Sequence, residues 1–530
     1  MFRRTTTSPR TADRLSYLWL ALAAALLLFA AGRWAIPLAA WLAPLFLLRF
    51  VRTQRLLPGL LLAWLVRAGI AVVVQRGIIL YPGMVYYVVV ALLTLLTMLP
   101  YLADLLLAHR LRGLSATLVF PVAYTALEYL TAFGPSGAFN SIANTQYGHL
   151  PLMQVAGVTG IWGITFLMTW FAAVATWAWE RGFARSEVRG PTMLYGGVLA
   201  TVLLGGGARL ALGSSPATTV RVAGLSASRA AVAALDRQLP QATLVRLQSG
   251  TATPSDRAVA RAALAVVYDD LLGRSRQEAR AGARIVVWPE VSPEGAQVLQ
   301  EDEPELIQRA GALARQEGIY LDLGLGVFLR DASGGPPLRD EAVLLDPAGH
   351  VVWTYEKTHP APGEQGLIVP GDGKVPVSAS PYGRLANLIC FDLDYPGTVR
   401  RAGQAGVDVM LAPSDDWQAI DPAHTQAAVF RAIENGFALV RPASKGLSMA
   451  VDGEGRVLAA ADYFTTGQQV MVAYVPTHGV RTIYAMIGDL FAWLCMIGVV
   501  ALIGLAILQG RKHPSTAAAG APLPEPQPTH

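Results

Sequence analysis

The stretch Leu385-Ala-Asn-Leu-Ile-Cys-Phe-Asp-Leu393 decides how the rest of the chain is interpreted. Four apolar residues and one asparagine lead into Cys390, which is the pattern of a buried strand. A thiol at the end of such a strand lies where a sheet opens into loops. Chemistry is common there, because the strand holds the residue rigidly while the loops admit substrate. Taken alone, however, a free cysteine is more often a small buried hydrophobe.

The composition places much of the chain in a membrane. The 530 residues are 53% hydrophobic and only 15% charged, with a mean hydropathy of +0.40, whereas soluble domains carry about 25% charged residues. The two cysteines, Cys390 and Cys495, lie far apart, and Cys495 is inside an apolar run, so we expect no disulfide framework. The chain has no Cys-x-x-Cys, His-Glu-x-x-His or paired histidine motif. We therefore expect no metal and no cofactor.

Eight apolar runs predict a polytopic α-helical membrane domain, because each run except a short second one is near the ~20 residues that cross a bilayer. The first run has the polar flank of a signal peptide, but further runs follow at once, so we expect a retained helix. The runs occupy residues 15–32, 35–50, 56–75, 78–100, 114–133, 160–179, 193–213 and 484–508.

Positive charge predicts the orientation of these spans. Basic residues concentrate in every second connection, namely 1–14, 49–55, 109–113, 180–190 and 511–513. The loop 134–159 has no lysine or arginine. Single arginines form the exceptions on the other side: Arg33, Arg76, Arg209 and Arg481. The alternation predicts that both termini are cytoplasmic and that the long polar segment after the seventh span lies outside.

The predicted organisation has four parts. A seven-helix transmembrane domain occupies residues 1–213, and an extracytoplasmic domain that is long enough for its own core occupies 214–480. Residues 481–513 form an eighth transmembrane helix with a basic end, and the Pro/Ala-rich tail 514–530 is expected to be disordered.

Residues 214–480 predict an α/β domain with a mixed sheet. Helical stretches such as Ala258–Ala281 and Thr425–Asn435 alternate with short β-like runs. Two sequences, Asp346-Pro-Ala-Gly-His350 and Asp452-Gly-Glu-Gly-Arg456, are typical of hairpin turns. The β-like runs begin at Val220, Ile285, Tyr320, Ala342, Leu385, Val407, Ala438 and Gln469.

Three predicted strands end in residues that could form one site. One strand leads to Glu290, another leads to Lys357, and the third ends at Cys390. Glu290 could take the thiol proton as general base and return it to a leaving group. Lys357 could stabilise the oxyanion of a tetrahedral intermediate, aided by the backbone N–H of Phe391. Taken singly, the two charged residues would be ordinary loop residues.

Glu364 is a further candidate in the loop after Lys357. It could orient the ammonium of Lys357 or a substrate amine. An ion pair with a purely structural role is an equally good interpretation of this carboxylate.

Three stretches carry a resemblance to known proteins: Trp288-Pro-Glu290, Glu356-Lys357-Thr-His359 with Gly363-Glu364, and Ile389-Cys390-Phe-Asp392. Together they look like the nitrilase (carbon–nitrogen hydrolase) superfamily. With several apolar spans before this region and one after it, the chain resembles the apolipoprotein N-acyltransferase family over roughly residues 15–510.

The resemblance implies a four-layer α/β/β/α domain on the outer face of a bacterial inner membrane, with Glu290, Lys357 and Cys390 as a catalytic triad. It also implies two half-reactions. Cys390 takes an acyl chain from a phospholipid as a thioester, and the N-terminal amine of a diacylglyceryl-cysteine apolipoprotein then accepts it. Asp392 stands where these acyltransferases usually have glutamate, which bears on a substrate contact. The segment from Lys357 to Cys390 is short for this family.

Other functions remain open beside the acyltransferase. The same triad would serve a membrane-tethered amidase that hydrolyses amides, although eight spans favour lipid substrates over soluble ones. A non-catalytic receptor with this fold would not need the three side chains intact. Further residues that could line the site, with core packing as their alternative role, are Trp417, His424 and Tyr395. We expect no nucleic-acid partner.

Overall fold

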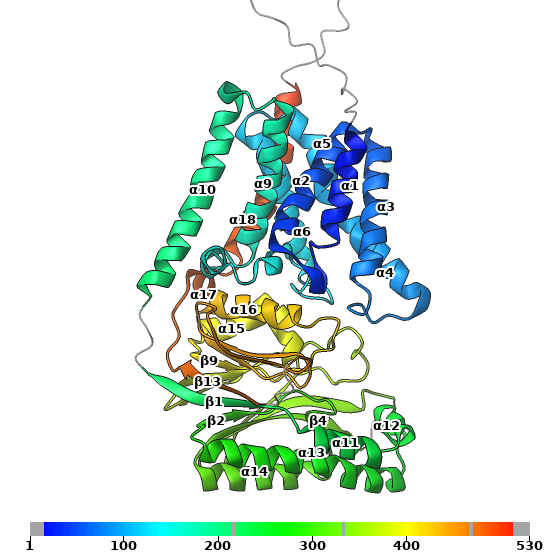
Figure 1. Ribbon diagram of the computed structural model, residues 1–530, viewed down its shortest axis with the longest axis vertical. Helices are drawn as coiled ribbons and strands as arrows, with labels where there is room; N and C mark the ends of the chain where they lie inside the picture. The colour runs from blue at the N-terminus through cyan, green and yellow to red at the C-terminus, as the bar shows by residue number, and fades with distance from the viewer. Residues whose placement is uncertain (1–14, 214–217, 331–333, 466–469, 512–530) are drawn as a thin grey trace, which may run out of the picture.

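The computed structural model describes residues 15–213, 218–330, 334–465 and 470–511. The basic segment 1–14 and the tail 514–530, for which the sequence made predictions, lie outside the described residues. Within the described residues, a bundle of helices stands on a two-sheet domain (Figure 1). The chain enters the sheets after α10 and returns to the bundle as α18.

The expected apolar runs form the helices of the bundle. These are α1 (Ser16–Leu27), α2 (Pro37–Thr53), α3 (Leu56–Val74), α4 (Gly83–Leu96), α5 (Leu99–Leu107), α6 (Leu114–Thr131), α9 (Trp162–Glu180), α10 (Arg185–Leu212) and α18 (Leu490–Arg511). Two short helices, α7 (Leu150–Met153) and α8 (Ala156–Thr159), precede α9, and the chain bends by 117° between them and α9.

Only some of these helices are long and apolar enough to cross a membrane. Among the described residues, four helical segments are long and apolar enough to cross a membrane, or five if the bent segment α7–α9 counts as one span. The expected spans at 15–32 and 35–50 are helices of 12 and 17 residues. The expected span at 114–133 is α6, which carries Glu128. The protein is therefore a membrane protein with several apolar helices, and the total of eight spans stays a prediction.

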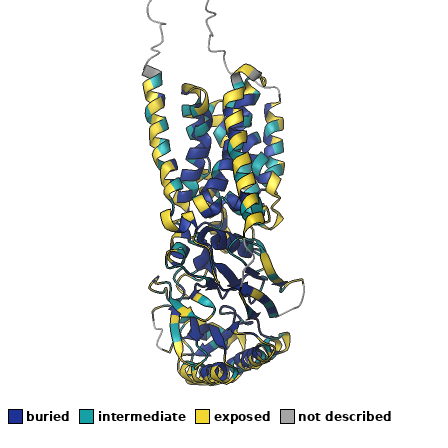
Figure 2. Ribbon diagram, turned by 90° about the vertical axis from the view of Figure 1, so that its left-hand side faces the viewer, coloured by how far each residue is buried: buried dark blue, intermediate teal, exposed yellow. Residues whose placement is uncertain are grey.

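The helices of the bundle expose apolar side chains on their outer faces. Exposed side chains gather on the outer faces of the helices, and buried ones line the interior (Figure 2). On α3, Leu57, Leu61 and Leu65 are 76%, 55% and 51% exposed and share one face at helical spacing. Inside the bundle, the charged Arg52 is paired, since it donates to both carboxylate oxygens of Asp104 at 2.7 and 2.8 Å.

Two sheets face each other in the second part of the chain. The first has the order β13-β1-β2-β4-β5-β6, with β3 paired to β4, and the second has the order β12-β11-β10-β9-β8-β7. The first sheet contains β1 (Thr219–Leu225), β2 (Ile285–Val287), β3 (Ala296–Leu299), β4 (Tyr320–Phe328), β5 (Leu338–Leu345), β6 (Val351–Glu356) and β13 (Val470–Pro476). The second contains β7 (Val377–Ser380), β8 (Gly383–Asn387), β9 (Val409–Leu411), β10 (Ala438–Arg441), β11 (Leu447–Val451) and β12 (Val457–Asp462).

Helices cover the outer face of each sheet (Figure 1). The first sheet is covered by α11 (Arg229–Gln238), α12 (Gln241–Gln248), α13 (Pro254–Arg280) and α14 (Glu303–Glu317). Between the second sheet and the bundle lie α15 (Pro396–Gln404) and α16 (Ala423–Asn435). Apolar side chains of both sheets, such as Ile285 and Leu411, pack against each other between them. The fold class is therefore confirmed as a helical membrane domain with a nitrilase-like α/β/β/α domain.

The strand directions bring the ends of β2 and β8 to related positions. β2 runs parallel to β1 and β4, and β8 runs parallel to β9. Within a sheet, the carboxyl ends of parallel strands meet at one edge. The loops after β1, β2 and β4 therefore share an edge of the first sheet, and the loops after β8, β9 and β10 share an edge of the second. Both predicted hairpins are confirmed, since β5 pairs with β6 across Asp346–His350 and β11 pairs with β12 across Asp452–Arg456.

Hydrogen bonds join the bundle to the two-sheet domain next to this edge. The amide of Ala138, in the loop after α6, donates to the carbonyl of Asp394 at 2.7 Å. The indole of Trp417 donates to the carbonyl of Gly77, in the loop after α3, at 2.7 Å. The loops that follow the strands of the second sheet thus lie directly against the bundle.

Candidate active site

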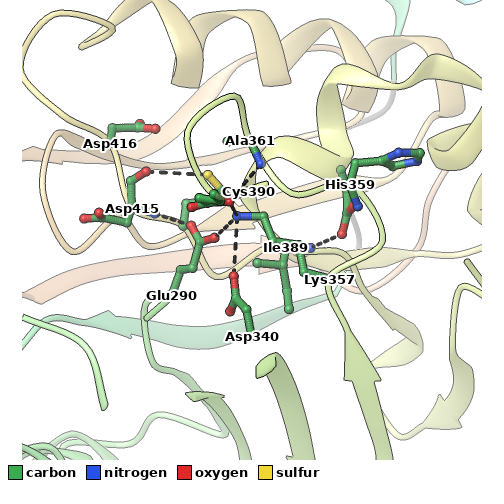
Figure 3. Close-up of polar contacts among 12 residues, drawn as sticks. Glu290, Asp340, Lys357, His359, Ala361, Ile389, Cys390, Asp415 and Asp416 are labelled. Carbon is green, nitrogen blue, oxygen red and sulfur yellow. Dashed lines mark hydrogen bonds and ion pairs between the residues drawn. The ribbon is translucent and has the colours of Figure 1, made fainter. Parts of the chain in front are cut away.

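Cys390 lies three residues beyond the end of β8 and begins the short 3-10 helix η4 (Cys390–Asp394). Its φ of +42° is rare for a residue with a side chain and occurs where neighbours hold the backbone. The amide of Cys390 donates to the carbonyl of Pro413 at 2.9 Å, and the thiol donates to the carbonyl of Asp415 at 3.5 Å. These contacts fix the sulfur at the loop edge of the second sheet (Figure 3).

Glu290 follows β2 and reaches the same place from the first sheet. Its side chain is buried, and Oε2 accepts a hydrogen bond from the amide of Asp415 at 2.7 Å. Oε1 accepts a hydrogen bond from the ammonium of Lys357. Asp415 therefore links Glu290 to the thiol. Its amide donates to the Glu290 carboxylate, and its carbonyl accepts the hydrogen bond from Sγ of Cys390. A carboxylate has lone pairs left after two such bonds, so Glu290 keeps the capacity to accept a proton.

Lys357 follows β6 and is completely buried. Besides Glu290, its Nζ lies 2.7 Å from Oε2 of Glu364. It also lies 3.4 Å from Oδ2 of Asp340 (Figure 3). Burial works against the charge of the ammonium, but the charges of the three carboxylates outweigh burial and raise the pKa of Lys357 well above its usual value. Lys357 is therefore a fixed positive charge at the site.

Asp340 lies on β5 beneath the ammonium and is also completely buried. Burial raises its pKa well above the usual carboxyl range, and the nearby charge of Glu290 raises it further. The surroundings of Asp340 therefore favour its protonated form more than those of an ordinary carboxyl group.

Glu364 closes the more open side of the ammonium. Its Oε2 accepts hydrogen bonds from Lys357 at 2.7 Å and from the amide of Ala361 at 2.8 Å. The side chain is 34% exposed, so it is the most solvent-accessible of the three carboxylates around the ammonium. The predicted contact between Glu364 and Lys357 is present.

Asp392 and Phe391 occupy two sides of η4. The Asp392 carboxylate accepts hydrogen bonds from the amides of Ile389 at 3.1 Å and His359 at 2.8 Å, and from the Tyr355 hydroxyl at 2.7 Å. Through these hydrogen bonds, Asp392 connects the residue before Cys390 to the segment after Lys357. Burial raises the pKa of Asp392 to about 7. The Phe391 amide lies in the first turn of η4, where N–H groups lack partners within the helix.

His424 lies on α16 beside the thiol and is buried between two carboxylates. Its Nδ1 is 2.6 Å from Oδ1 of Asp416, and its Nε2 is 2.7 Å from Oδ2 of Asp394. Burial works against the charged ring, but Asp394 and Asp416 raise the pKa of His424 well above its usual value. Polar atoms of Cys390, Asp416 and His424 lie within 4.8 Å of one another. Because Arg441 already pairs with Asp416 at 2.8 Å, this group forms an ion-pair network.

Trp417 and Tyr395 surround the site and contact the bundle. Trp417 bonds to Gly77, as described above, and the Tyr395 hydroxyl donates to the carbonyl of Gly134 at 3.2 Å. The Tyr395 ring also stacks on His359, with 3.7 Å between ring centroids. Both residues therefore connect the two parts of the chain, and their contact with substrate stays a prediction.

The environment of the thiol disfavours its charged form at rest. Burial, reinforced by the negative charge of Glu290, raises the pKa of Cys390 to about 12. The positive charges of His424 and Lys357 act in the opposite direction. The resting thiol is therefore neutral, and its proton must be removed as the sulfur attacks.

Several residues of the site were missed from the sequence. Asp340 lies 3.4 Å from the Lys357 ammonium but is inside a strand, where a carboxylate gives no local signal of its partners. The network around His424 depends on residues from three separate segments, namely Asp394, Asp416 and Arg441. A usable signal was the pair Asp415-Asp416 directly after an apolar strand, because two carboxylates there need buried partners.

Comparisons with known proteins agree with this division of the chain. Residues 23–174 match the apolipoprotein N-acyltransferase N-terminal domain, and residues 242–484 match the carbon-nitrogen hydrolase family. Apolipoprotein N-acyltransferase from Geobacter metallireducens is 27% identical over 482 residues, which cover 85% of this chain and 82% of that protein. The protein of the same name from Brucella melitensis is 27% identical over 397 residues, which cover 69% of this chain and 68% of that protein.

Amidases match the second part of the chain. Deaminated glutathione amidase from Rattus norvegicus is 31% identical over 232 residues, which cover 38% of this chain and 70% of the amidase. The crystal structure of an amidase from Nesterenkonia sp. has 22% sequence identity and a TM-score of 0.38, and the match covers 52% of this chain and 96% of that chain. The matches to both parts, over most of its length, place this chain in the apolipoprotein N-acyltransferase family, with a carbon-nitrogen hydrolase domain as its second part.

Proposed function

We propose that the protein is a membrane N-acyltransferase with Glu290, Lys357 and Cys390 as its catalytic triad. It moves an acyl chain from a phospholipid, through a thioester on Cys390, to the N-terminal amine of a diacylglyceryl-cysteine in an apolipoprotein. The observation that carries this proposal is the position of the thiol. It lies beside a buried carboxylate–ammonium pair, at the edge of the sheets that faces a bundle of apolar helices. Relatives named apolipoprotein N-acyltransferase match this chain over most of its length.

The first half-reaction loads the thiol. Glu290 accepts the proton of Cys390 as Sγ attacks the carbonyl carbon of a phospholipid ester. The negative charge that develops on the carbonyl oxygen is stabilised by the Lys357 ammonium and the Phe391 amide. The carbon–oxygen bond to glycerol then breaks, the glycerol oxygen takes the proton from Glu290, and a lysophospholipid leaves.

The second half-reaction unloads the thioester. The neutral amine of the acceptor attacks the thioester carbonyl, and Glu290 accepts a proton from the nitrogen. The carbon–sulfur bond breaks, an amide forms, and the leaving sulfur of Cys390 regains the proton. Because the acyl group waits on the protein, two substrates that are both held in the membrane can use one site in turn.

The location of the reaction belongs to the same proposal. We place residues 214–480 on the outer, periplasmic side of a bacterial inner membrane, with both termini in the cytoplasm. The alternation of basic connections supports this orientation. The contacts of Ala138 and Trp417 keep the site close to the outer ends of the helices, where lipid esters are found.

A membrane-tethered amidase is the second candidate, because amidases match the second part of the chain. The match of residues 23–174 to the acyltransferase N-terminal domain favours the transferase. Incubation of the purified protein with phospholipid that carries a labelled acyl chain distinguishes the two. The transferase forms an acyl adduct on Cys390 that hydroxylamine removes, and a labelled amide appears when a lipopeptide amine is added.

Two cysteine variants serve as controls in this experiment. Cys390→Ala abolishes the adduct, and Cys495→Ala, which removes a thiol within α18, leaves it intact. Intact protein that hydrolyses small amides but never forms the adduct from phospholipid would refute the transferase.

A further inference from the structure

A cavity that the triad does not use lies where the bundle meets the two-sheet domain. It has a volume of about 200 Å³, and three segments line it: the turn after α1, the end of α3 and the loop after Trp417. Its lining residues are Arg33, Trp34, Val73, Val74, Arg76 and Ala419. Two arginines from separate helix ends thus share one small space.

The charges in this cavity are not balanced by the protein. Among the residues that the structure describes, no carboxylate lies within 4 Å of a guanidinium nitrogen of Arg33 or Arg76. The guanidinium of Arg33 lies 4.7 Å from the centre of the Trp34 ring instead. Two like charges in one cavity repel each other, and an anion between them would remove that repulsion. Guanidinium groups recognise phosphate particularly well, because their N–H groups match two of its oxygens.

The surroundings of the cavity are those of a lipid headgroup. Arg33 and Arg76 are two of the single arginines that break the pattern of basic connections. They follow α1 and α3, and they line one cavity with Ala419 of the two-sheet domain. The Trp34 ring is 45% exposed, as is usual for an indole at a membrane surface. The neighbouring Val73 is exposed on the apolar surface of α3. A molecule with a phosphate in the cavity could therefore lay acyl chains along the helices.

The cavity is also close to the thiol. Ala419, in its wall, is four residues from Asp415, whose carbonyl accepts the hydrogen bond of Cys390. Four residues span at most about 14 Å. The hydrogen bond from Trp417 to Gly77 fixes this segment against the residue that follows Arg76. A phosphate in the cavity would therefore hold the glycerol esters of its lipid on the side of Cys390.

We propose that Arg33 and Arg76 bind the phosphate of the phospholipid acyl donor. The proposal rests on the proposed function and adds a donor-recognition site to it. The arginines do not touch the reacting atoms. They select a donor with a phosphate on its glycerol and hold its ester at the thiol.

The test compares two donors with the same acyl chains, one with a phosphate-containing headgroup and one without it. One is phosphatidylethanolamine, and the other is diacylglycerol with the same acyl chains, each supplied in nanodiscs. The readout is the kcat/KM for acyl-adduct formation on Cys390 in the full-length protein. The wild-type protein is expected to prefer phosphatidylethanolamine. The double variant Arg33→Gln/Arg76→Gln should lose about tenfold to a hundredfold of kcat/KM with this donor, mostly through KM, since it lacks charge-assisted hydrogen bonds to phosphate.

Diacylglycerol supplies the internal control. The double variant should acylate as fast as wild type from this donor, which shows that the triad and the fold are intact. Arg33→Lys/Arg76→Lys keeps the charge but not the two-point geometry, so it should lie between wild type and the glutamine variant. Arg481→Gln removes another exposed arginine before α17 (Ile483–Ile487) and should leave the donor preference unchanged.

The outcomes separate this proposal from the proposed function. A double glutamine variant that keeps the wild-type donor preference would overturn the phosphate site and leave the acyltransferase in place. The same holds if its kcat/KM falls equally with both donors. Wild-type protein that forms an adduct with neither donor would overturn both. Inorganic phosphate is the second probe. Inhibition of phospholipid transfer by inorganic phosphate in wild type, but not in the double variant, supports the site. Inhibition that is the same in both proteins opposes it.

Discussion

Replacement of Lys357 by methionine tests the electrostatics of the site most directly. The ammonium is buried among Glu290, Glu364 and Asp340, so its removal leaves the Glu290 charge buried without a cation. Loss of one partner from a buried ion pair costs about 3–5 kcal/mol. For a domain of this size, each kcal/mol lowers the thermal midpoint by about 2–4 °C, so the expected drop is roughly 6–20 °C. Loss of the oxyanion donor that we propose for Lys357 should also slow adduct formation by about 10²–10³-fold.

Asp340→Asn is the matched control, because it changes a neighbour of the same ammonium. Burial and the charge of Glu290 raise the pKa of Asp340 well above the usual range, which favours the uncharged form that an asparagine mimics. An amide of the same shape should lower the free energy of unfolding by only about 1 kcal/mol.

The assay records thermal midpoints in one detergent and single-turnover rates of adduct formation, for wild type, Lys357→Met and Asp340→Asn. The reasoning is refuted if Lys357→Met melts at the wild-type temperature. It is also refuted if Asp340→Asn is as damaging as Lys357→Met, because Asp340 would then be a charged partner.

Three further predictions concern pH and the backbone. Burial raises the pKa of Asp322 to about 7, so the folded protein binds more protons than the unfolded chain between about pH 4 and 7, and stability falls as pH rises through that window. Asp322→Asn should therefore raise the thermal midpoint at pH 8 and leave it nearly unchanged at pH 4; equal shifts at both pH values would contradict this. Gly436 has a φ of +76°, and an added Cβ would lie 1.7 Å from the Val480 carbonyl oxygen. Gly436→Ala should cost more than about 1 kcal/mol, whereas Gly273→Ala, which has open space on α13, should be stabilising by up to about 1 kcal/mol in the same melting assay. Because the pKa of Cys390 is about 12, its alkylation by iodoacetamide should be slow at pH 7 and should rise with pH through pH 10, and a plateau near pH 8 would show a stabilised thiolate.

The sequence predicted those features that depend on local patterns. Apolar runs indicated the helices of the bundle, and alternating runs with Gly-containing turns indicated the strands and both hairpins. Glu290, Lys357 and Cys390 were singled out because each lies at or shortly after the end of a predicted strand. Their strands β2, β6 and β8 are not neighbours in one sheet, and the two facing sheets bring the three residues together. The structure brings the first two into contact and places the thiol one residue, Asp415, away from them.

The features that the sequence did not predict depend on long-range register. Asp340 reaches the ammonium because β5 pairs antiparallel with β6, which places the start of β5 beside the end of β6. No pattern around Asp340 carries this information. His424 was predicted only as a lining residue, because its partners Asp394 and Asp416 come from two loops whose approach to α16 is a tertiary property.

The contacts between the bundle and the two-sheet domain bear on how the protein could be divided. Ala138 holds the backbone of Asp394, and the edge of the Phe139 ring packs on His424 at 5.4 Å between centroids. A truncated protein that starts after α10 would thus expose to water the wall of the candidate site that the bundle now covers. Such a soluble fragment would lose more than its anchor, and the smallest active unit should include the helices.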